Sequence, residues 1–208
     1  MSTELEQSAL SAYFSTVCSM PVYWSVQHQV LNTENFTESE SAKFTTISSE
    51  KRKNEYIQGR HALKEVLGKI SYQTDTSLLV WPNTYCSLSH SEGYAVAVAS
   101  ATTQGLGLDL QLTKMPSLAM AERILSKQTF SYWQALPNEQ KSPALQRLWT
   151  VNEAVYKASP EPQPANFRQY VIDQPDSMQC TVSVAGNSVE YSVFSLQLTN
   201  GFISIAMR

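Results

Sequence analysis

WTVNEAVYK, at residues 149–157, aligns without a gap with YIQGRHALK, at residues 56–64. Each segment begins with an aromatic residue, has a charged residue four positions on and has a lysine four positions beyond that. Side chains four positions apart share one face of a helix, so each segment predicts a helix with two charged groups on one face. The shared spacing indicates a weak internal duplication of the chain, with chance similarity as the alternative.

Each of these segments is followed by two strand patterns joined by a turn that contains glycine. Residues 85–93 lead into YAVAVA at residues 94–99, and residues 193–201 lead into FISIA at residues 202–206. Both patterns indicate an antiparallel hairpin, and the apolar face of a hairpin must be covered by another element. The sequence therefore predicts an α+β fold of two pseudo-twofold-related subdomains, each a helix packed on a small antiparallel sheet.

The link between the two repeats is short and not rich in proline. It covers residues 100–104 and predicts an N-terminal subdomain at residues 1–104 and a C-terminal subdomain at residues 105–208. The cleft between two such halves is the natural site for a ligand. Three prolines within residues 160–164 predict the end of the second helix and the start of an exposed loop.

The composition is that of a globular protein, with 42% hydrophobic and 16% charged residues among 208. A net charge of −3 offers no general attraction for nucleic acid or an anionic membrane. Cys18, Cys86 and Cys180 have neither a C-x-x-C pair nor zinc-site spacing, so a disulfide framework is not expected. No apolar run suits a signal peptide or a membrane span. We expect a cytoplasmic protein that binds neither nucleic acid nor membrane.

Charge is distributed unevenly along the chain. The net charge is −5 over residues 1–50, +4 over residues 51–157 and −2 over residues 158–208. Half of the central bases lie within residues 51–69, where the segment Ser48-Ser49-Glu50 predicts a helix start. Such a run is usually the solvated face of a helix. Because the central segment is basic, a local patch could still bind a polyanion.

The segment GLGLDLQ, at residues 105–111, has the pattern of a strand that carries an acidic residue. It lacks the spacing of a dinucleotide-binding or Walker-type loop. Alternation along a strand places Asp109 and Gln111 on the same side, and two oxygen donors on one face suit Mg²⁺. A purely structural strand is the alternative.

The helix predicted at residues 148–158 supplies a third oxygen donor, Glu153, with Lys157 one turn away. The simplest interpretation is an exposed helical ion pair. The same pair also suits a phosphate site, where the carboxylate holds metal or acts as a base and the lysine neutralises phosphate oxygen. His90 stands where the second repeat has Leu198; a lone histidine is more often structural, but a polar replacement at a matched position favours a function. Nothing suggests a Ser-His-Asp mechanism.

Three motifs occur in a characteristic order: Ser89-His90, GLDLQ at residues 107–111, and WTVNEAVYK at residues 149–157. They resemble the Ser-His pair, the G-[IV]-D-[IV]-[EQ]-like strand and the W-[ST]-x-K-E-[AS]-x-x-K helix of the 4'-phosphopantetheinyl transferase superfamily. Arg52, Gly59-Arg60 and Val80-Trp81-Pro82 resemble the two-subdomain branch that activates surfactin and enterobactin synthetases. The resemblance spans about residues 48–160.

This resemblance implies Mg²⁺-dependent transfer of the phosphopantetheine arm of coenzyme A to a serine of an acyl or peptidyl carrier protein, with release of 3',5'-ADP. The implied catalytic residues are Glu153, Asp109 and Lys157, with Glu153 as a base for the incoming serine. The implied metal ligands are Asp109, Gln111 and Glu153. The implied coenzyme A-binding residues are Arg52, Arg60, Ser89, His90 and Lys157. Such a set agrees with phosphoryl transfer, which depends mainly on positioning and charge neutralisation.

Two positions depart from the family pattern. Gln111 stands where many members have Glu, and Asn152 stands where the helix motif has Lys. The catalytic set remains, so we expect an active enzyme. The alternatives are a catalytically weakened module that binds coenzyme A or a carrier, and an α+β protein with coincidental motifs.

The expected partners are coenzyme A and an apo carrier protein, and the expected state is a monomer. Carriers of this kind are typically acidic, so the resemblance implies a basic or apolar docking surface near the cleft. The loop at residues 158–170 is the nearest candidate, with Arg168 as its base and with Phe167 and Tyr170 as apolar anchors.

Overall fold

The computed structural model describes residues 5–29, 32–72, 75–113, 116–159, 166–186 and 188–208. The α-helices are α1 (Gln7–Val17), α2 (Glu38–Thr45), α3 (Glu50–Lys69), α4 (Ala121–Ile124), α5 (Lys127–Ala135) and α6 (Asn138–Ala158). The strands are β1 (Tyr23–Gln27), β2 (Cys86–Ser91), β3 (Tyr94–Ala99), β4 (Leu106–Leu112), β5 (Tyr170–Ile172), β6 (Gln179–Val184), β7 (Glu190–Leu198) and β8 (Gly201–Met207). Short 3₁₀ turns are η1 (Thr76–Leu78), η2 (Leu118–Met120) and η3 (Phe167–Gln169).

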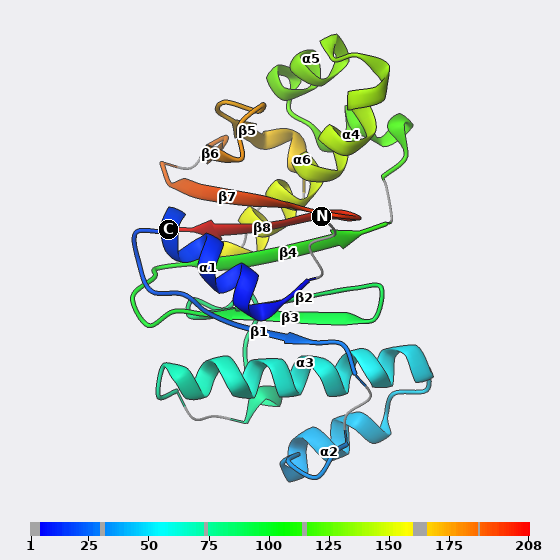
Figure 1. Cartoon of the computed structure of the whole chain (residues 1–208), viewed down its shortest axis with the longest axis vertical. Helices are drawn as coiled ribbons and strands as arrows, with labels where there is room; N and C mark the ends of the chain where they lie inside the picture. The colour runs from blue at the N-terminus through cyan, green and yellow to red at the C-terminus, as the bar shows by residue number, and fades with distance from the viewer. Residues whose placement is uncertain (1–4, 30–31, 73–74, 114–115, 160–165, 187) are drawn as a thin grey trace.

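The strands form two antiparallel sheets, which lie one above the other in Figure 1. The three-stranded sheet has the order β1-β3-β2, and the five-stranded sheet has the order β4-β8-β7-β6-β5. Helix α3 covers the first sheet and helix α6 covers the second. The predicted α+β class, with a helix on a small antiparallel sheet in each half, is confirmed. The boundary between residues 104 and 105 stays a prediction.

Both predicted hairpins are present. Strands β2 and β3 pair across a turn in which Glu92 and Gly93 have φ angles of 48° and 81°. The positive φ angle is adopted by glycine without steric cost, which explains Gly93 at this corner. Strands β7 and β8 form the second hairpin, from Leu198↔Gly201 to Ser192↔Met207.

Helix α3 begins where the sequence predicts. Ser49 is the N-cap, and its side chain accepts a hydrogen bond from the Arg52 amide. The buried face includes Leu63 and Val66, which pack on β2 and β3. Gly59 allows a close approach, because a Cβ atom there would lie 2.9 Å from the Nε2 atom of His90.

Helix α6 begins at Asn138, ten residues before the start predicted at residue 148. The additional turns are polar and contain Pro143, and the buried face starts at Leu145. The first turns of α6 therefore lack the apolar periodicity by which a helix is predicted from sequence. The proline loop predicted at residues 160–164 lies outside the described residues.

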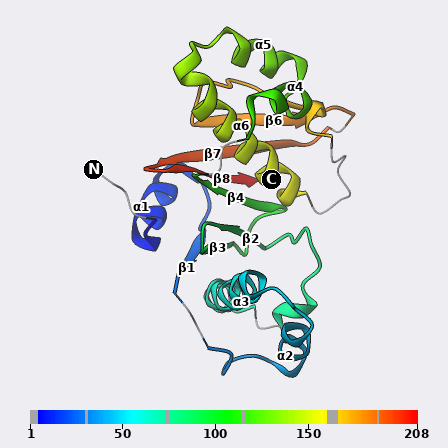
Figure 2. The same cartoon turned by 90° about the vertical axis from the view of Figure 1, so that its right-hand side faces the viewer.

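The five-stranded sheet is covered on both faces. Helix α1 lies on one face and α6 on the other (Figure 2), so every residue of β8 is buried. The α1 side of this core also contains Trp24, Val96 and Val98 from the three-stranded sheet. One apolar cluster therefore spans both sheets. No helix in the described ranges is long and apolar enough to cross a membrane.

Candidate active site

The site is built around Asp109, at the centre of β4. Alternation along β4 directs Leu108 and Leu110 into the α1-side core and leaves Asp109 on the α6 side. Gly107 brings α6 close, because a Cβ atom there would lie 1.8 Å from the carbonyl oxygen of Ala154. Asp109 is 3% exposed, so its carboxylate needs close partners.

Two polar groups from different halves meet the Asp109 carboxylate. The Nζ atom of Lys157 lies 2.7 Å from Oδ1 of Asp109 and 3.5 Å from Oγ of Ser89. The Ser89 hydroxyl donates to the same Asp109 oxygen at 3.0 Å. The structure therefore brings together three residues that the sequence predicts for the site, from β2, β4 and α6.

Glu153 lies one turn before Lys157 on α6 and is partly buried. Burial raises the pKa of its carboxyl group, and the nearby Asp109 charge raises it further, against the opposing effect of Lys157. No hydrogen bond to this carboxylate is present among the described residues. Glu153 is therefore an acidic group near Asp109 whose lone pairs are free to accept a cation or a proton.

Gln111 lies on the same face of β4 as Asp109, as predicted from the alternation. Its Nε2 atom donates to Oδ2 of Asp109 at 3.2 Å. In this arrangement the amide nitrogen rather than the amide oxygen is directed to the carboxylate. Gln111 thus stabilises the charge of Asp109, whereas a glutamate here would add a second negative charge.

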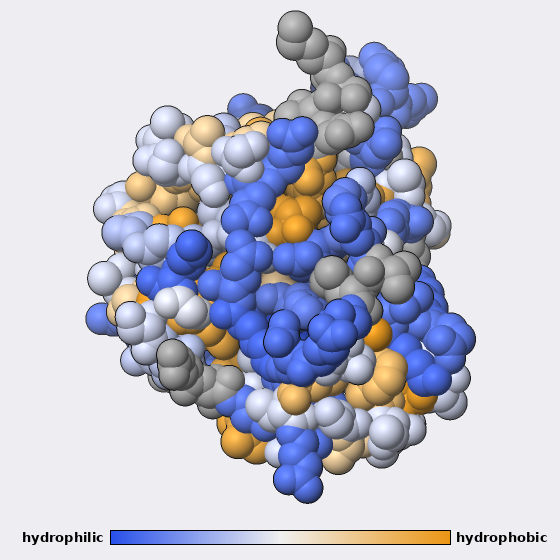
Figure 3. Space-filling view, turned by 60° about the horizontal axis from the view of Figure 1, so that its bottom comes forward, coloured by the Kyte–Doolittle hydropathy of each residue, from blue (hydrophilic) through white to orange (hydrophobic). Residues whose placement is uncertain are grey.

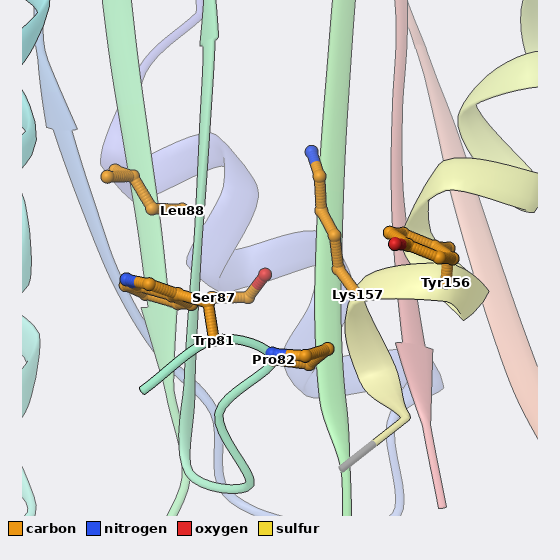
Figure 4. A pocket seen from close by; sticks show the side chains of 6 residues that line it. All are labelled: Trp81, Pro82, Ser87, Leu88, Tyr156 and Lys157. Atoms are coloured by element: carbon orange, nitrogen blue, oxygen red, sulfur yellow. The ribbon is translucent and has the colours of Figure 1, made fainter. Parts of the chain in front are cut away.

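A cavity of about 320 Å³ lies between the two halves next to this cluster. The residues that line it are Trp81, Pro82, Ser87, Leu88, Tyr156 and Lys157. In Figure 4, Trp81 and Leu88 lie on one side and Tyr156 on the other, with Lys157 between them. Tyr156 directly precedes Lys157 in the sequence, but no charge or motif position marked it as a residue of the site. A cleft between the halves, as predicted, is therefore present beside the charged cluster.

Two family models match the chain. One, for the 4'-phosphopantetheinyl transferase superfamily, matches residues 105–204, and the other, for the 4'-phosphopantetheinyl transferase N-terminal domain, matches residues 40–100. The chain belongs to the 4'-phosphopantetheinyl transferase superfamily. It is a transferase of the two-subdomain type, as the three motifs predict. A search among curated proteins returned no significant match.

The donor set of the transferase fits a divalent cation that is shared with a phosphorylated ligand. Asp109 and Glu153 provide two carboxylates, and the described residues contain no group of three or more His, Cys, Asp or Glu side chains arranged for a metal. Mg²⁺ usually takes one or two carboxylates and fills its remaining positions with phosphate oxygens and water. The two carboxylates are therefore compatible with a divalent cation whose remaining ligands come from outside the protein.

His90 of the transferase faces away from Ser89. Neighbouring residues of a strand point to opposite faces, and the Nε2 atom of His90 lies 2.8 Å from the carbonyl oxygen of Glu55 on α3. Burial lowers the pKa of the imidazole, which favours the neutral ring. The structure thus places His90 against α3 rather than in the Asp109 cluster, and its contact with coenzyme A stays a prediction.

The two predicted arginines occupy different environments. Arg60 is only 8% exposed, stacks over the Tyr56 ring and donates from Nη1 to the carbonyl oxygen of Thr76 at 2.7 Å. Arg52 is exposed in the first turn of α3. Figure 3 brings this lower end of the molecule forward and shows hydrophilic side chains across the middle of the face, with hydrophobic patches around them. No hydrogen bond or ion pair in the described ranges joins either side chain to Asp109. Their phosphate-binding roles stay predictions.

Asn152 and Tyr170 also have surroundings that the sequence did not reveal. Asn152 is fully buried, and its Nδ2 atom donates to the carbonyl oxygen of Ile124 in α4 at 2.9 Å. It therefore packs against α4, and no hydrogen bond within the described part of the chain joins it to Asp109 or Lys157. Tyr170 is 0% exposed, so its prediction as a surface anchor for a carrier is wrong, because β5 carries it into the α6-side core.

Proposed function

We propose that the transferase moves the 4'-phosphopantetheine arm of coenzyme A onto a serine of an acyl or peptidyl carrier protein, with Mg²⁺ bound, and releases 3',5'-ADP. The main support is the convergence of Lys157 and Ser89 on Asp109, with contacts of 2.7 and 3.0 Å. This arrangement combines an acidic metal-binding group with a cation and a hydroxyl, which is the chemistry that a pyrophosphate requires.

The proposed binding roles follow from the positions of these groups. Asp109 and Glu153 would hold the cation, and Gln111 could add its amide oxygen after the amide turns over. When bound, Mg²⁺ would neutralise charge on the pyrophosphate oxygens. Lys157 would exchange its contact with Asp109 for one with a phosphate oxygen, because both acceptors are anionic and lie on the same side of α6.

The proposed reaction forms a bond between the carrier serine oxygen and the phosphorus atom of the phosphopantetheine group. The bond between that phosphorus and the oxygen of 3',5'-ADP breaks, and the serine proton must be accepted by a base. Glu153 suits this role, because burial raises the pKa of its carboxyl group towards the working pH. 3',5'-ADP leaves with the bridging oxygen.

A carrier-labelling assay tests this function. Incubation with Mg²⁺, coenzyme A and a panel of apo carriers should add the mass of the arm to the carrier, and EDTA should stop the reaction. Glu153→Gln should lower the rate by at least about 100-fold, because it removes the proposed base and a metal ligand. Glu139→Gln, an exposed position on the same helix, should not change it. Absence of labelling across the panel would contradict the proposal.

The alternative of a catalytically weakened binding module has less support. Its motivation was the pair Asn152 and Gln111, but Asn152 is buried against α4, and Gln111 contacts Asp109 without displacing it. Coenzyme A binding without carrier labelling would support this alternative.

The cytoplasmic location and the monomeric state remain part of this proposal. Cys18, Cys86 and Cys180 are all free, which is typical of a reducing compartment. For carrier docking, residues 160–165 of the proposed loop lie outside the described residues. Phe167 is partly exposed and stacks edge-on with Trp149, so it is the apolar anchor that we retain.

A further inference from the structure

Strand β2 is an edge of the three-stranded sheet, and β4 is an edge of the five-stranded sheet. The two strands lie side by side where the sheets meet, and side chains of β2 join them. Three serine hydroxyls of β2 accept hydrogen bonds from three backbone amides of β4. The pairs are Ser87 with Leu108 at 2.9 Å, Ser89 with Leu110 at 3.1 Å and Ser91 with Leu112 at 2.9 Å. We call these three hydrogen bonds the serine seam.

The serine seam defines one register between the sheets. Both strands advance by two residues from one hydrogen bond to the next, so the two strands run parallel and the offset is 21 residues each time. A slip by one residue would turn the serines to the α3 face of the sheet. The edge amides of β4 would then lose their acceptors, which is unfavourable in a buried position.

The middle hydrogen bond connects this register to the active site. Ser89 accepts from the Leu110 amide and donates to Asp109 at 3.0 Å. Ser91 forms the outer hydrogen bond, next to the turn at Glu92. Among the described residues it makes no hydrogen bond to Asp109 or to Lys157. The hydrogen bond from the Leu112 amide therefore links Ser91 to the active site through the position of β4.

We propose that Ser91 is a positioning residue of the transferase, whose hydroxyl holds β4 in the register that brings Asp109 to Ser89. This inference rests on the proposed reaction of coenzyme A, which requires Asp109 at a defined place beside the pyrophosphate. Phosphoryl transfer depends on alignment, and a misplacement of about 1 Å costs about 100-fold in rate. Because no hydrogen bond in the described ranges joins Ser91 to Asp109 or Lys157, its loss should affect kcat more than KM.

The test compares Ser91→Ala with Ser91→Thr. We expect Ser91→Ala to lower kcat for carrier labelling about tenfold, with the KM for coenzyme A changed less than about threefold. Ser91→Thr keeps the hydroxyl and should recover kcat to within about twofold of the natural enzyme. Amide hydrogen exchange followed by NMR should show faster exchange at Leu112 in Ser91→Ala and not in Ser91→Thr.

Ser25→Ala is the matched control. Ser25 lies in the same sheet and its hydroxyl donates to Glu65 of α3 at 2.7 Å, so its loss removes a comparable hydrogen bond on the opposite face. It should leave kcat and Leu112 exchange unchanged. An unchanged kcat in Ser91→Ala, an equal loss in Ser25→Ala or no recovery in Ser91→Thr would overturn the inference. If the natural enzyme labels no carrier, it is the proposed function that fails. Independently of activity, an unchanged exchange rate of the Leu112 amide in Ser91→Ala would contradict the role of the Ser91 hydroxyl in the serine seam.

Discussion

Lys64 and Lys157, which align in the predicted duplication, each pair with a buried carboxylate, but the two carboxylates differ in what surrounds them. Lys64 lies 2.5 Å from Glu40, and Lys157 lies 2.7 Å from Asp109. Glu40 is 0% exposed and also accepts hydrogen bonds from Thr76 and from the Thr37 amide. Both oxygens of this carboxylate already have protein partners, so its role is structural. Beside the Lys157 pair, the Glu153 carboxylate lies near Asp109 with no hydrogen bond in the described ranges, which leaves that site open to a ligand.

The pKa of Glu153 predicts a pH-dependent gain in stability for Glu153→Gln. Burial raises this pKa, so the folded state binds the proton more tightly than the unfolded chain. The ionised carboxylate then destabilises the fold at a pH above the folded pKa, and the penalty disappears as the pH falls below the unfolded value near 4.3. Thermal unfolding in EDTA should give a higher Tm for Glu153→Gln at pH 7, with the difference shrinking towards pH 4. An equal or lower Tm at pH 7 would refute this.

Lys157 should contribute directly to binding of coenzyme A. Lys157→Met should weaken the Kd about 10- to 100-fold, because a hydrogen bond from a charged group contributes about 1.5–3 kcal/mol. Calorimetric titration with Mg²⁺ and coenzyme A, without carrier, measures the effect. Lys127→Met, at an exposed position of α5, should bind as the natural protein does. Equal affinities of the two variants would argue against the proposed phosphate contact.

The close packing of α6 against β4 is the contact between elements that forms the active site. Gly107 permits it on the strand side, and the small side chains of Ala154 and Ala158 permit it on the helix side. This approach carries Lys157 to Asp109. The sequence shows a glycine at position 107. The steric requirement for glycine there follows only from the position of helix α6 in the folded protein.

Gly107→Ala should therefore destabilise the fold and reduce activity together. The new Cβ atom would lie 1.8 Å from the carbonyl oxygen of Ala154 and 2.5 Å from the amide nitrogen of Ala158, and backbone atoms cannot rotate away. We expect the free energy of unfolding, measured by urea denaturation, to fall by about 1–3 kcal/mol or more. Gly68→Ala, with no atom within 4 Å and within helix α3, should instead stabilise by about 0.5–1 kcal/mol. A neutral Gly107→Ala would contradict the packing argument.

The molecule as a whole is joined by α1 as well as by the serine seam. Phe14 of α1 stacks on Trp24 of β1 with ring centroids 4.6 Å apart, and the Tyr13 hydroxyl donates to the carbonyl oxygen of Ser195 in β7 at 2.9 Å. One helix thus contacts both sheets. Together with the apolar cluster shared by both sheets, this contact favours cooperative unfolding of the two halves.

Phe14→Ala tests that cooperativity. The side chain is 0% exposed, so its truncation should cost about 3–5 kcal/mol. The urea transition should remain single by both fluorescence and circular dichroism, because α1 supports both sheets. Ser15→Ala, on the exposed face of α1, should change stability by less than about 0.5 kcal/mol. Two separate transitions in the natural protein would contradict joint unfolding.

Local patterns in the sequence determined the class of fold, the N-cap of α3, both hairpins and the order of the three family motifs. These features depend on the spacing of residues close in the chain, which the periods of helices and strands define. The same periods predicted that Asp109 and Gln111 share a face.

Only the tertiary structure decided which element covers each face. It directed Ser89 to β4 and His90 to α3. It also buried Arg60, whose guanidinium donates to the Thr76 carbonyl oxygen, and buried Tyr170 in the core. Finally, it aligned the serines of β2 with the amides of β4. The physical reason is that alternation along a strand shows only that its two faces differ. The residues that pack on each face come from segments far apart in the chain. Their approach is set by packing of the whole molecule.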